Sequence, residues 1–111
     1  MLFVEFDGPS AVFQAVSQGV CASVARVLRT APEEVVLRRR VYEGAYAGIE
    51  VWIELSSDEQ RYRFAARLAQ EITAAVRPHT AEDVWVLFRI VPLDQAYLNG
   101  MPRRRDSAPL G

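Results

Sequence analysis

Apolar positions along this chain follow two spacings, and their order predicts a strand, a helix and a second strand. A short apolar run predicts the first strand over residues 2–6. From Ser10, a candidate N-cap, to about Arg29, valines recur every three or four residues, which is the spacing of an amphipathic helix. A segment rich in β-branched residues predicts the second strand over 35–42, and residues 44–48 predict a turn.

The second half of the chain repeats this order. Residues 49–55 predict a third strand, and residues 84–91 predict a fourth. The helix between them begins near Ser56, because Ser56 and Glu59 have the spacing of a capping box. It is expected to end near residues 77–78. Its expected buried positions recur at helical spacing: Phe64, Leu68, Ile72 and Val76.

The two halves also align residue by residue. Glu5 coincides with Glu54 when the first half is shifted by 49 positions, and the same shift, without a gap, brings Arg40 onto Arg89. Few residues are identical, but the order of the elements agrees throughout. We interpret the chain as two pseudo-symmetric β-α-β units.

Two such units predict an α+β fold of two layers in a single domain, with units 1–48 and 49–100 and a tail over 101–111 that contains Arg and Pro. Parallel strands joined by a right-handed helical crossover give a four-stranded mixed sheet with both helices on one face. The other face would be bare, and alternation along the strands predicts apolar side chains there: Leu2, Val4, Phe6, Trp85 and Leu87. We therefore expect an oligomer that covers this face.

Composition agrees with an ordinary globular domain, since half of the 111 residues are hydrophobic and 24% are charged. Thirteen basic against fourteen acidic residues give a net charge of −1, so no overall field favours nucleic acid or an anionic membrane, and we expect neither as a partner. Every basic residue is arginine, which excludes mechanisms that need a lysine Schiff base or a phosphate-loop lysine.

One cysteine cannot form an internal disulfide or a cysteine-based zinc site, and one histidine excludes a pair of histidine ligands. We expect neither a metal nor a cofactor. No apolar run approaches the 18 residues of a membrane span, and the first residues lack the basic-then-apolar order of a signal peptide. The expected location is the cytoplasm.

Four segments of the second half, taken in order, resemble the tautomerase superfamily, the family of 4-oxalocrotonate tautomerase, malonate semialdehyde decarboxylase and macrophage migration inhibitory factor. They are Ile-Glu-Leu-Ser-Ser-Asp-Glu-Gln at 53–60, Ala-Glu-Asp-Val-Trp-Val at 81–86, Val-Pro at 91–92 and Asn-Gly at 99–100. The resemblance reaches the first half through the internal repeat. It implies a β-α-β building block and, for a chain with two blocks, a homotrimer around a barrel of sheets.

The same resemblance implies a chemistry that this chain lacks in its usual form. The family uses an N-terminal proline as general base or acid, and here Leu2 stands where that proline would be. The family's arginines hold the carboxylate of the substrate, and their usual positions are occupied here by Val36, Ser56 and Trp85. The chain is identified as a member without the N-terminal proline.

Two groups are candidates for proton transfer at the start of the chain. Met1 supplies an α-amine that could act as a base or nucleophile, with Leu2 in the place of the family's proline. If the first strand is buried as in the family, this amine lies at the mouth of a pocket. The alternative is an ordinary exposed terminus.

Four further residues are candidates for binding a small carboxylate substrate. Strand alternation places Arg38, Arg40 and Arg89 on the face that carries the catalytic arginine in the family, two or four residues further along. Tyr97 could line a pocket or donate a hydrogen bond to an enolate. The alternatives are salt bridges between subunits for the arginines, with Glu5, Glu50 or Glu54, and interface packing for the tyrosine.

Three functions remain open at this point. The first is a divergent tautomerase relative with weak keto-enol tautomerase activity on small α-keto or enol carboxylates, an isomerase or related lyase if active. The second is a catalytically inactive oligomer of the same fold that serves as a small-ligand-binding or structural module. The third is an unrelated ligand-binding regulatory domain with the same layers.

Overall fold

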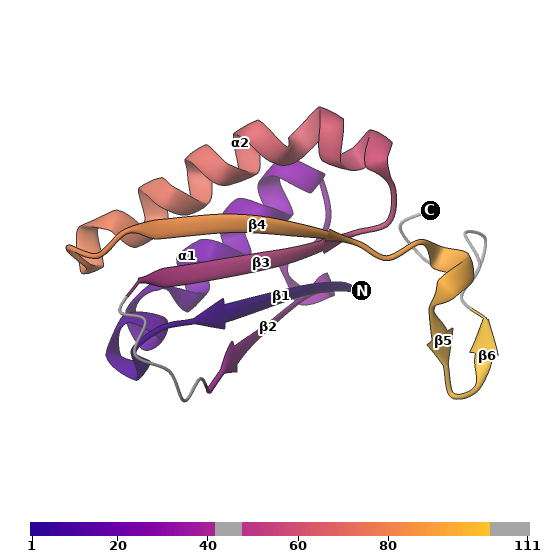
Figure 1. Cartoon of the computed structure of the whole chain (residues 1–111), viewed down its shortest axis with the longest axis horizontal. Helices are drawn as coiled ribbons and strands as arrows, with labels where there is room; N and C mark the ends of the chain where they lie inside the picture. Colours follow the sequence, from indigo (N-terminus) through magenta and orange to yellow (C-terminus); the bar gives the residue numbers. More distant parts are fainter. Residues whose placement is uncertain (42–47, 103–111) are drawn as a thin grey trace.

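The computed structural model describes residues 1–41 and 48–102, which form two β-α-β units followed by a small hairpin (Figure 1). The first unit consists of β1 (Leu2–Asp7), α1 (Ser10–Leu28), a 3₁₀ turn (Pro32–Glu34) and β2 (Val35–Arg40). The second consists of β3 (Ile49–Leu55), α2 (Asp58–Val76), a 3₁₀ turn (Arg77–His79) and β4 (Val84–Ile90). A third 3₁₀ turn (Leu93–Gln95) leads to β5 (Tyr97–Leu98) and β6 (Met101–Pro102).

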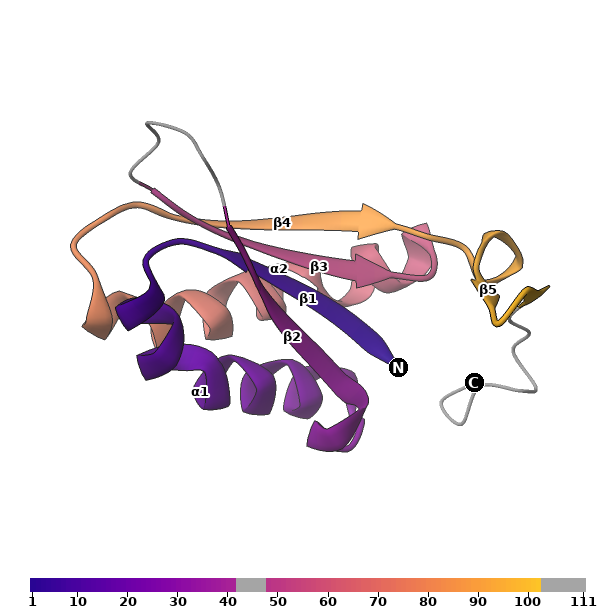
Figure 2. The same cartoon turned by 90° about the horizontal axis from the view of Figure 1, so that it is seen from below.

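The main sheet has four strands in the order β2-β1-β3-β4, and both helices cover one of its faces (Figure 2). Strands β1 and β2 are parallel, as are β3 and β4, because each pair is joined by a helical crossover. The central pair is antiparallel, with Val4 opposite Ile53 and Glu5 opposite Trp52. The predicted mixed sheet with two helices on one face is therefore confirmed.

The core lies between the sheet and the helices, and it contains residues that we expected on the bare face. Val4 and Phe6 of β1 are fully buried under the helices, and the Phe6 ring lies 5.4 Å from the ring of Phe13 on α1. Leu2 also packs against this core. The prediction for these three residues was wrong because alternation shows which side chains share a face, and not which face the helices cover.

The face away from the helices, which we call the open face, carries the alternate residues of each strand. On β4 these include Trp85, which is 53% exposed, and Leu87, as predicted. The open face carries charged and aromatic side chains together. Its members are Phe3, Glu5 and Asp7 on β1, Val36, Arg38 and Arg40 on β2, Glu50, Trp52 and Glu54 on β3, and Trp85, Leu87 and Arg89 on β4.

Both helices begin differently from the predictions. Pro9, not Ser10, is the N-cap of α1, and no side chain caps this helix. In α2 the N-cap is Ser57, one residue after the predicted one, and its Oγ accepts a hydrogen bond of 3.1 Å from the Gln60 amide. The reciprocal bond differs from that of a capping box by one residue, because Gln60 Oε1 accepts from the backbone amide of Ser56, the residue before the N-cap, at 2.9 Å.

The remaining boundaries lie close to the predictions. The expected buried positions Leu68, Ile72 and Val76 are fully buried, and Phe64 packs partly buried against the core. Strand β2 ends at Arg40, and most of the predicted turn at 44–48 lies outside the described residues. The described part of the predicted tail, Met101–Pro102, is the second strand of the hairpin, and residues 103–111 lie outside the described part.

The β5–β6 hairpin turns at Asn99 and Gly100, which both have a positive φ, of 53° and 79°. Two consecutive residues of this kind are typical of the tight turn that Asn-Gly favours. In Figure 1 the hairpin projects beyond the end of β4, away from the helix layer.

Helix α1 is long and apolar enough to cross a membrane when judged by length and composition alone, with a mean hydropathy of 1.3. By this criterion, the expectation that no apolar run approaches the length of a membrane span does not hold for α1. In the structure, however, α1 lies on the sheet and contributes buried residues to the core, as a crossover helix must. The side chains that it buries are Val16, Val20, Ser23, Val24, Ala25 and Val27.

Candidate anion-binding site

Arginines from both edge strands and one glutamate from β1 line a depression of about 470 Å³. The lining residues are Glu5, Arg38, Arg39, Arg40 and Arg89. Register brings them together: β1 and β2 are parallel with Glu5 beside Arg38, and β4 lies on the other side of β3. Four guanidinium groups and one carboxylate line the depression, and further acids of the open face, Asp7, Glu50 and Glu54, lie on the same strands.

Arg89 crosses a whole strand to reach this depression. Its register neighbour on β3 is Glu54, yet its Nη1 donates to Oε1 of Glu5 on β1 at 3.1 Å. On the way its guanidinium covers the indole of Trp52, 4.5 Å from the ring centroid. Trp52 in turn donates its Nε1–H to Oε1 of Glu50 at 2.8 Å. A cation–π contact and a fixed indole therefore hold Arg89 over β3.

The arginines of β2 approach from the opposite side. Arg40 Nη1 lies 4.0 Å from Oε2 of Glu5, so the two oxygens of this carboxylate face guanidiniums from opposite edges of the sheet. The Arg38 guanidinium lies 5.2 Å from the centroid of the Phe3 ring. It has no ion pair within residues 1–41 and 48–102.

Arg39 also lines this depression, although it alternates with Arg38 and Arg40 along β2. Its Nε donates to the backbone oxygen of Gly8 at 3.1 Å. This bond ties the edge strand β2 to the end of β1. Chemically, the depression offers planar guanidinium donors, which match the two oxygens of a carboxylate better than any other side chain does.

Met1 and Leu2, the candidates for proton transfer, do not line the depression that the arginines share. The Met1 amine forms an ion pair with Glu34 at 3.3 Å, at the beginning of β2. Arg40 lies beside Asp7 at the other end of β1, roughly 20 Å along the strand. Leu2 packs against the core. The structure does not bring this amine and the arginine cluster into one site.

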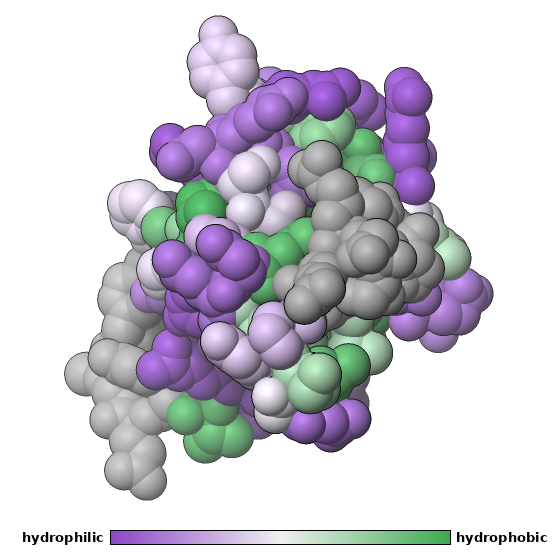
Figure 3. All heavy atoms as spheres, turned by 90° about the vertical axis from the view of Figure 1, so that its right-hand side faces the viewer, coloured by the Kyte–Doolittle hydropathy of each residue, from purple (hydrophilic) through white to green (hydrophobic). Residues whose placement is uncertain are grey.

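Tyr97, the fourth binding candidate, is 66% exposed on the β5–β6 hairpin and does not line the depression. The N-terminus and the hairpin lie at the same end of the molecule in both ribbon views. Figure 3 shows this end, where apolar side chains form separate patches between polar ones.

The positions that carry arginines in the resembled family have other side chains and other contacts. Ser56 donates its Oγ–H to Oε1 of Gln60 at 2.8 Å and so belongs to the start of α2. Val36 and Trp85 lie on the open face, beside Phe3 and Glu50 respectively. The positive charge of the cluster therefore comes from different positions of the strands.

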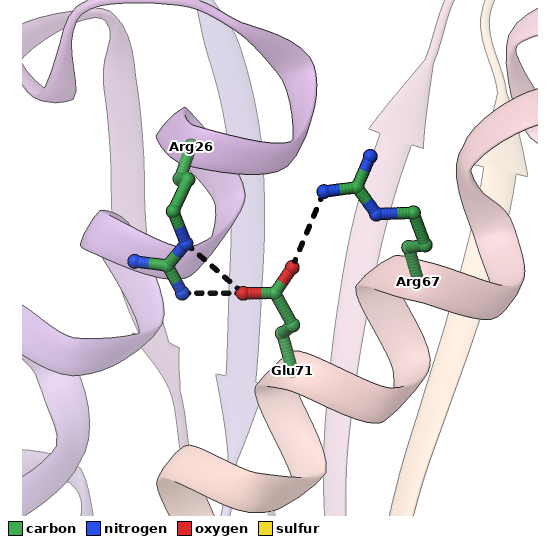
Figure 4. Close-up of polar contacts among 3 residues, drawn as sticks. All are labelled: Arg26, Arg67 and Glu71. Atoms are coloured by element: carbon green, nitrogen blue, oxygen red, sulfur yellow. Dashed lines mark hydrogen bonds and ion pairs between the residues drawn. The ribbon is translucent and has the colours of Figure 1, made fainter.

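A second arginine cluster lies on the helix layer and joins α1 to α2 (Figure 4). Arg26 of α1 donates through Nε and Nη2 to one oxygen of Glu71 on α2, with the Nε contact at 3.0 Å. Arg67 lies 3.8 Å from the other oxygen. Because both oxygens of Glu71 already have partners, this cluster links the helices and offers no obvious place to an anion.

Cys21 lines a separate groove of about 560 Å³ between α1 and β2, with Phe13, Pro32, Val35 and Leu37 among its apolar neighbours. Burial raises the pKa of the Cys21 thiol, so the thiol form dominates at neutral pH. In the described part of the chain, no three His, Cys, Asp or Glu side chains are grouped closely enough to hold a metal ion.

Sequence reasoning found three of the arginines, but it missed the residue that orients Arg89. Trp52 was not among the predicted binding residues, although it alternates with Glu50 and Glu54 along β3. That alternation of charged and aromatic residues opposite a buried row marks a strand face with polar contacts. Glu5 had been considered only as a partner between subunits, whereas it pairs with Arg40 and Arg89 of its own chain.

No protein-family model matches the chain, and no curated protein matches it. Solved structures do. A protein of unknown function from Vibrio cholerae superposes with a TM-score of 0.76 at 16% identity, covering 91% of this chain and 86% of that one. A macrophage migration inhibitory factor-like protein from Entamoeba histolytica gives 0.71 at 5% identity, with 91% and 97% covered.

A fused 4-OT, an asymmetric trimer, gives a TM-score of 0.68 at 15% identity and covers 96% of this chain and 99% of that chain. At these identities the likeness concerns the fold. It confirms the tautomerase fold that the sequence motifs predicted.

Proposed function

We propose that this tautomerase-fold protein binds a small carboxylate, an α-keto or enol acid, at the guanidinium groups of Arg38, Arg40 and Arg89. One observation carries the proposal: Arg40 and Arg89 already flank a carboxylate, that of Glu5, from two strands. Guanidinium groups held in this way already surround a position that a carboxylate can occupy. Arg38, which lines the same depression, adds a third donor.

The depression supports binding better than proton transfer. A tautomerase needs a base within hydrogen-bond reach of the carbon acid. The Met1 amine is not among the residues that line the depression and lies instead beside Glu34. We therefore favour a catalytically inactive, ligand-binding member of the fold.

We further propose that three copies assemble with their open faces turned inward, so that the depression lined by Glu5, Arg38, Arg40 and Arg89 faces the interior of the trimer. Three fused 4-OT structures with this fold are trimers, two asymmetric and one symmetric. The open face of this chain carries partly exposed aromatic and aliphatic side chains, Trp85 the most exposed of them. Apolar side chains of this kind are stabilised when a partner removes them from water.

The binding proposal predicts that Arg40→Gln weakens the affinity for 2-oxoglutarate about tenfold to a hundredfold, measured by isothermal titration calorimetry. A hydrogen bond to a charged group contributes about 1.5–3 kcal/mol, which corresponds to this range. Arg61→Gln is the matched control, because Arg61 is an exposed arginine on α2 whose ion pair is with Asp58. Equal affinities of the two variants would contradict the proposal.

A weak tautomerase is the second candidate, and one observation favours it. At the start of β1, the Met1 ammonium and the Glu34 carboxylate form a donor–acceptor pair at 3.3 Å. We expect slow ketonisation of phenylenolpyruvate by the natural protein, lost when its amine is acetylated, and a faster reaction by Leu2→Pro with a free N-terminal proline. The decrease in the absorbance of the enol measures the rates of both reactions. No activity in the natural protein would exclude this candidate.

A further inference from the structure

We propose that Glu5 sets the anion affinity of the arginine cluster by occupying, with its own carboxylate, the place that a ligand carboxylate would take. This inference rests on the proposed function, namely that the cluster binds small carboxylates. Glu5 would then be a specificity-determining residue, because it lowers the affinity for ligands whose charge is too small to compete with its own carboxylate.

The contacts of Glu5 resemble those of a bound ligand. Its Oε1 accepts from Arg89 Nη1 at 3.1 Å, and its Oε2 lies 4.0 Å from Arg40 Nη1. The Glu5 side chain is only 26% exposed, and it lines the depression together with both arginines. Each oxygen faces a guanidinium that comes from a different edge strand, Arg40 from β2 and Arg89 from β4. A ligand carboxylate has to share these donors or displace Glu5 from them.

The arrangement is specific to Glu5 and is not a general property of acids on this face. Arg89 lies next to Glu54 in register, which is the repeat counterpart of Glu5, yet it bonds to Glu5. Stacking on Trp52 holds the Arg89 side chain across β3 and away from its neighbour. Within the described residues Glu54 has no ion pair, so the repeat symmetry is broken at this point.

A carboxylate that binds between Arg40 and Arg89 lies within a few ångströms of the Glu5 carboxylate. Like charges at such a separation repel strongly when they are partly buried. Removing the charge of Glu5 while keeping its shape therefore favours the ligand. It also frees two guanidiniums that are otherwise neutralised in part. Both effects have the same sign.

The test compares Glu5→Gln with Glu54→Gln, which makes the same change of charge at the repeat-related position on the same face. We expect Glu5→Gln to bind 2-oxoglutarate at least tenfold more tightly than the natural protein in isothermal titration calorimetry. Glu54→Gln is expected to change the affinity less than threefold. Circular dichroism establishes that both variants are folded. Glu5→Ala, which also removes the charge, is expected to change the affinity in the same direction and replaces Glu5→Gln if that variant does not fold.

The outcomes separate this inference from the proposed function. If the natural protein binds 2-oxoglutarate and Glu5→Gln binds it equally or more weakly, the inference is wrong and the binding function stands. If only Glu5→Gln binds, the inference stands and the natural protein is not a carboxylate binder under those conditions. Similar gains in Glu5→Gln and Glu54→Gln would show a general charge effect and overturn the inference. Absence of binding in every variant overturns both.

Discussion

Replacing Phe6 with alanine is expected to lower the free energy of unfolding by about 3–5 kcal/mol, measured by urea denaturation at a fixed chain concentration. Phe6 is fully buried, its ring contacts Phe13 of α1, and a methyl group added at Gly8 would lie only 2.9 Å from its Cε1. The packing around this ring is therefore tight, and its removal leaves a cavity. A domain of this size has about 5–15 kcal/mol in total.

Phe3→Ala is the matched control, because it removes the same ring from the opposite face of the same strand. Within one chain Phe3 lies on the open face and is only partly buried, so at a chain concentration where the protein is monomeric its loss is expected to cost less than half as much as that of Phe6. Equal losses for the two variants would show that the open face is as important for folding as the helix-covered face. This pair tests directly which side of β1 belongs to the core.

Replacing Trp85 with glutamate is expected to convert the proposed trimer into a monomer. Sedimentation equilibrium should then give the mass of one 12.5 kDa chain instead of three times that mass. Trp85 is 53% exposed on the open face, so the single chain tolerates a polar side chain there. Between subunits, a carboxylate at position 85 loses its hydration beside the like charge of Glu50, its register neighbour, which costs several kcal/mol.

The control for this experiment is Tyr62→Glu. Tyr62 is an aromatic residue, 92% exposed, that lies on α2 in the helix layer. It receives the same kind of substitution on the face that we do not expect to be an interface. If Tyr62→Glu dissociates the protein and Trp85→Glu does not, subunits meet through the helices. If the natural protein is a monomer, the trimer proposal is wrong.

The tautomerase fold could be predicted because its evidence is local and repeated. Periodic valines, a Ser-Ser-Asp-Glu-Gln helix start and an Asn-Gly turn each depend on residues close in the chain. The repeat then related Arg40 to Arg89 and so indicated that both units contribute to one sheet. The cap of α2 was displaced by one residue, since Ser56 and Ser57 are both good caps and only the path of the chain selects Ser57.

The candidate site was predictable only in part. Alternation placed Arg38, Arg40 and Arg89 on a common face, and the structure brings Arg40 and Arg89 to one carboxylate. Alternation could not show that Arg89 passes over Trp52 or that Met1 is paired with Glu34 at the start of β1. Long arginine side chains can follow several directions from the same backbone position, so their partners depend on neighbouring strands.

The amino-acid sequence therefore established the order of the elements, the mixed sheet and the residues that share each strand face, because periodicity acts along the chain. Only the tertiary structure decided that Val4 and Phe6 lie under the helices and that Glu5 faces the arginines. Both decisions depend on which face the crossover helices cover. If the helices covered the other face, every buried side chain of a strand would become exposed and every exposed one buried. The alternation of residues along the strand would be the same in both cases.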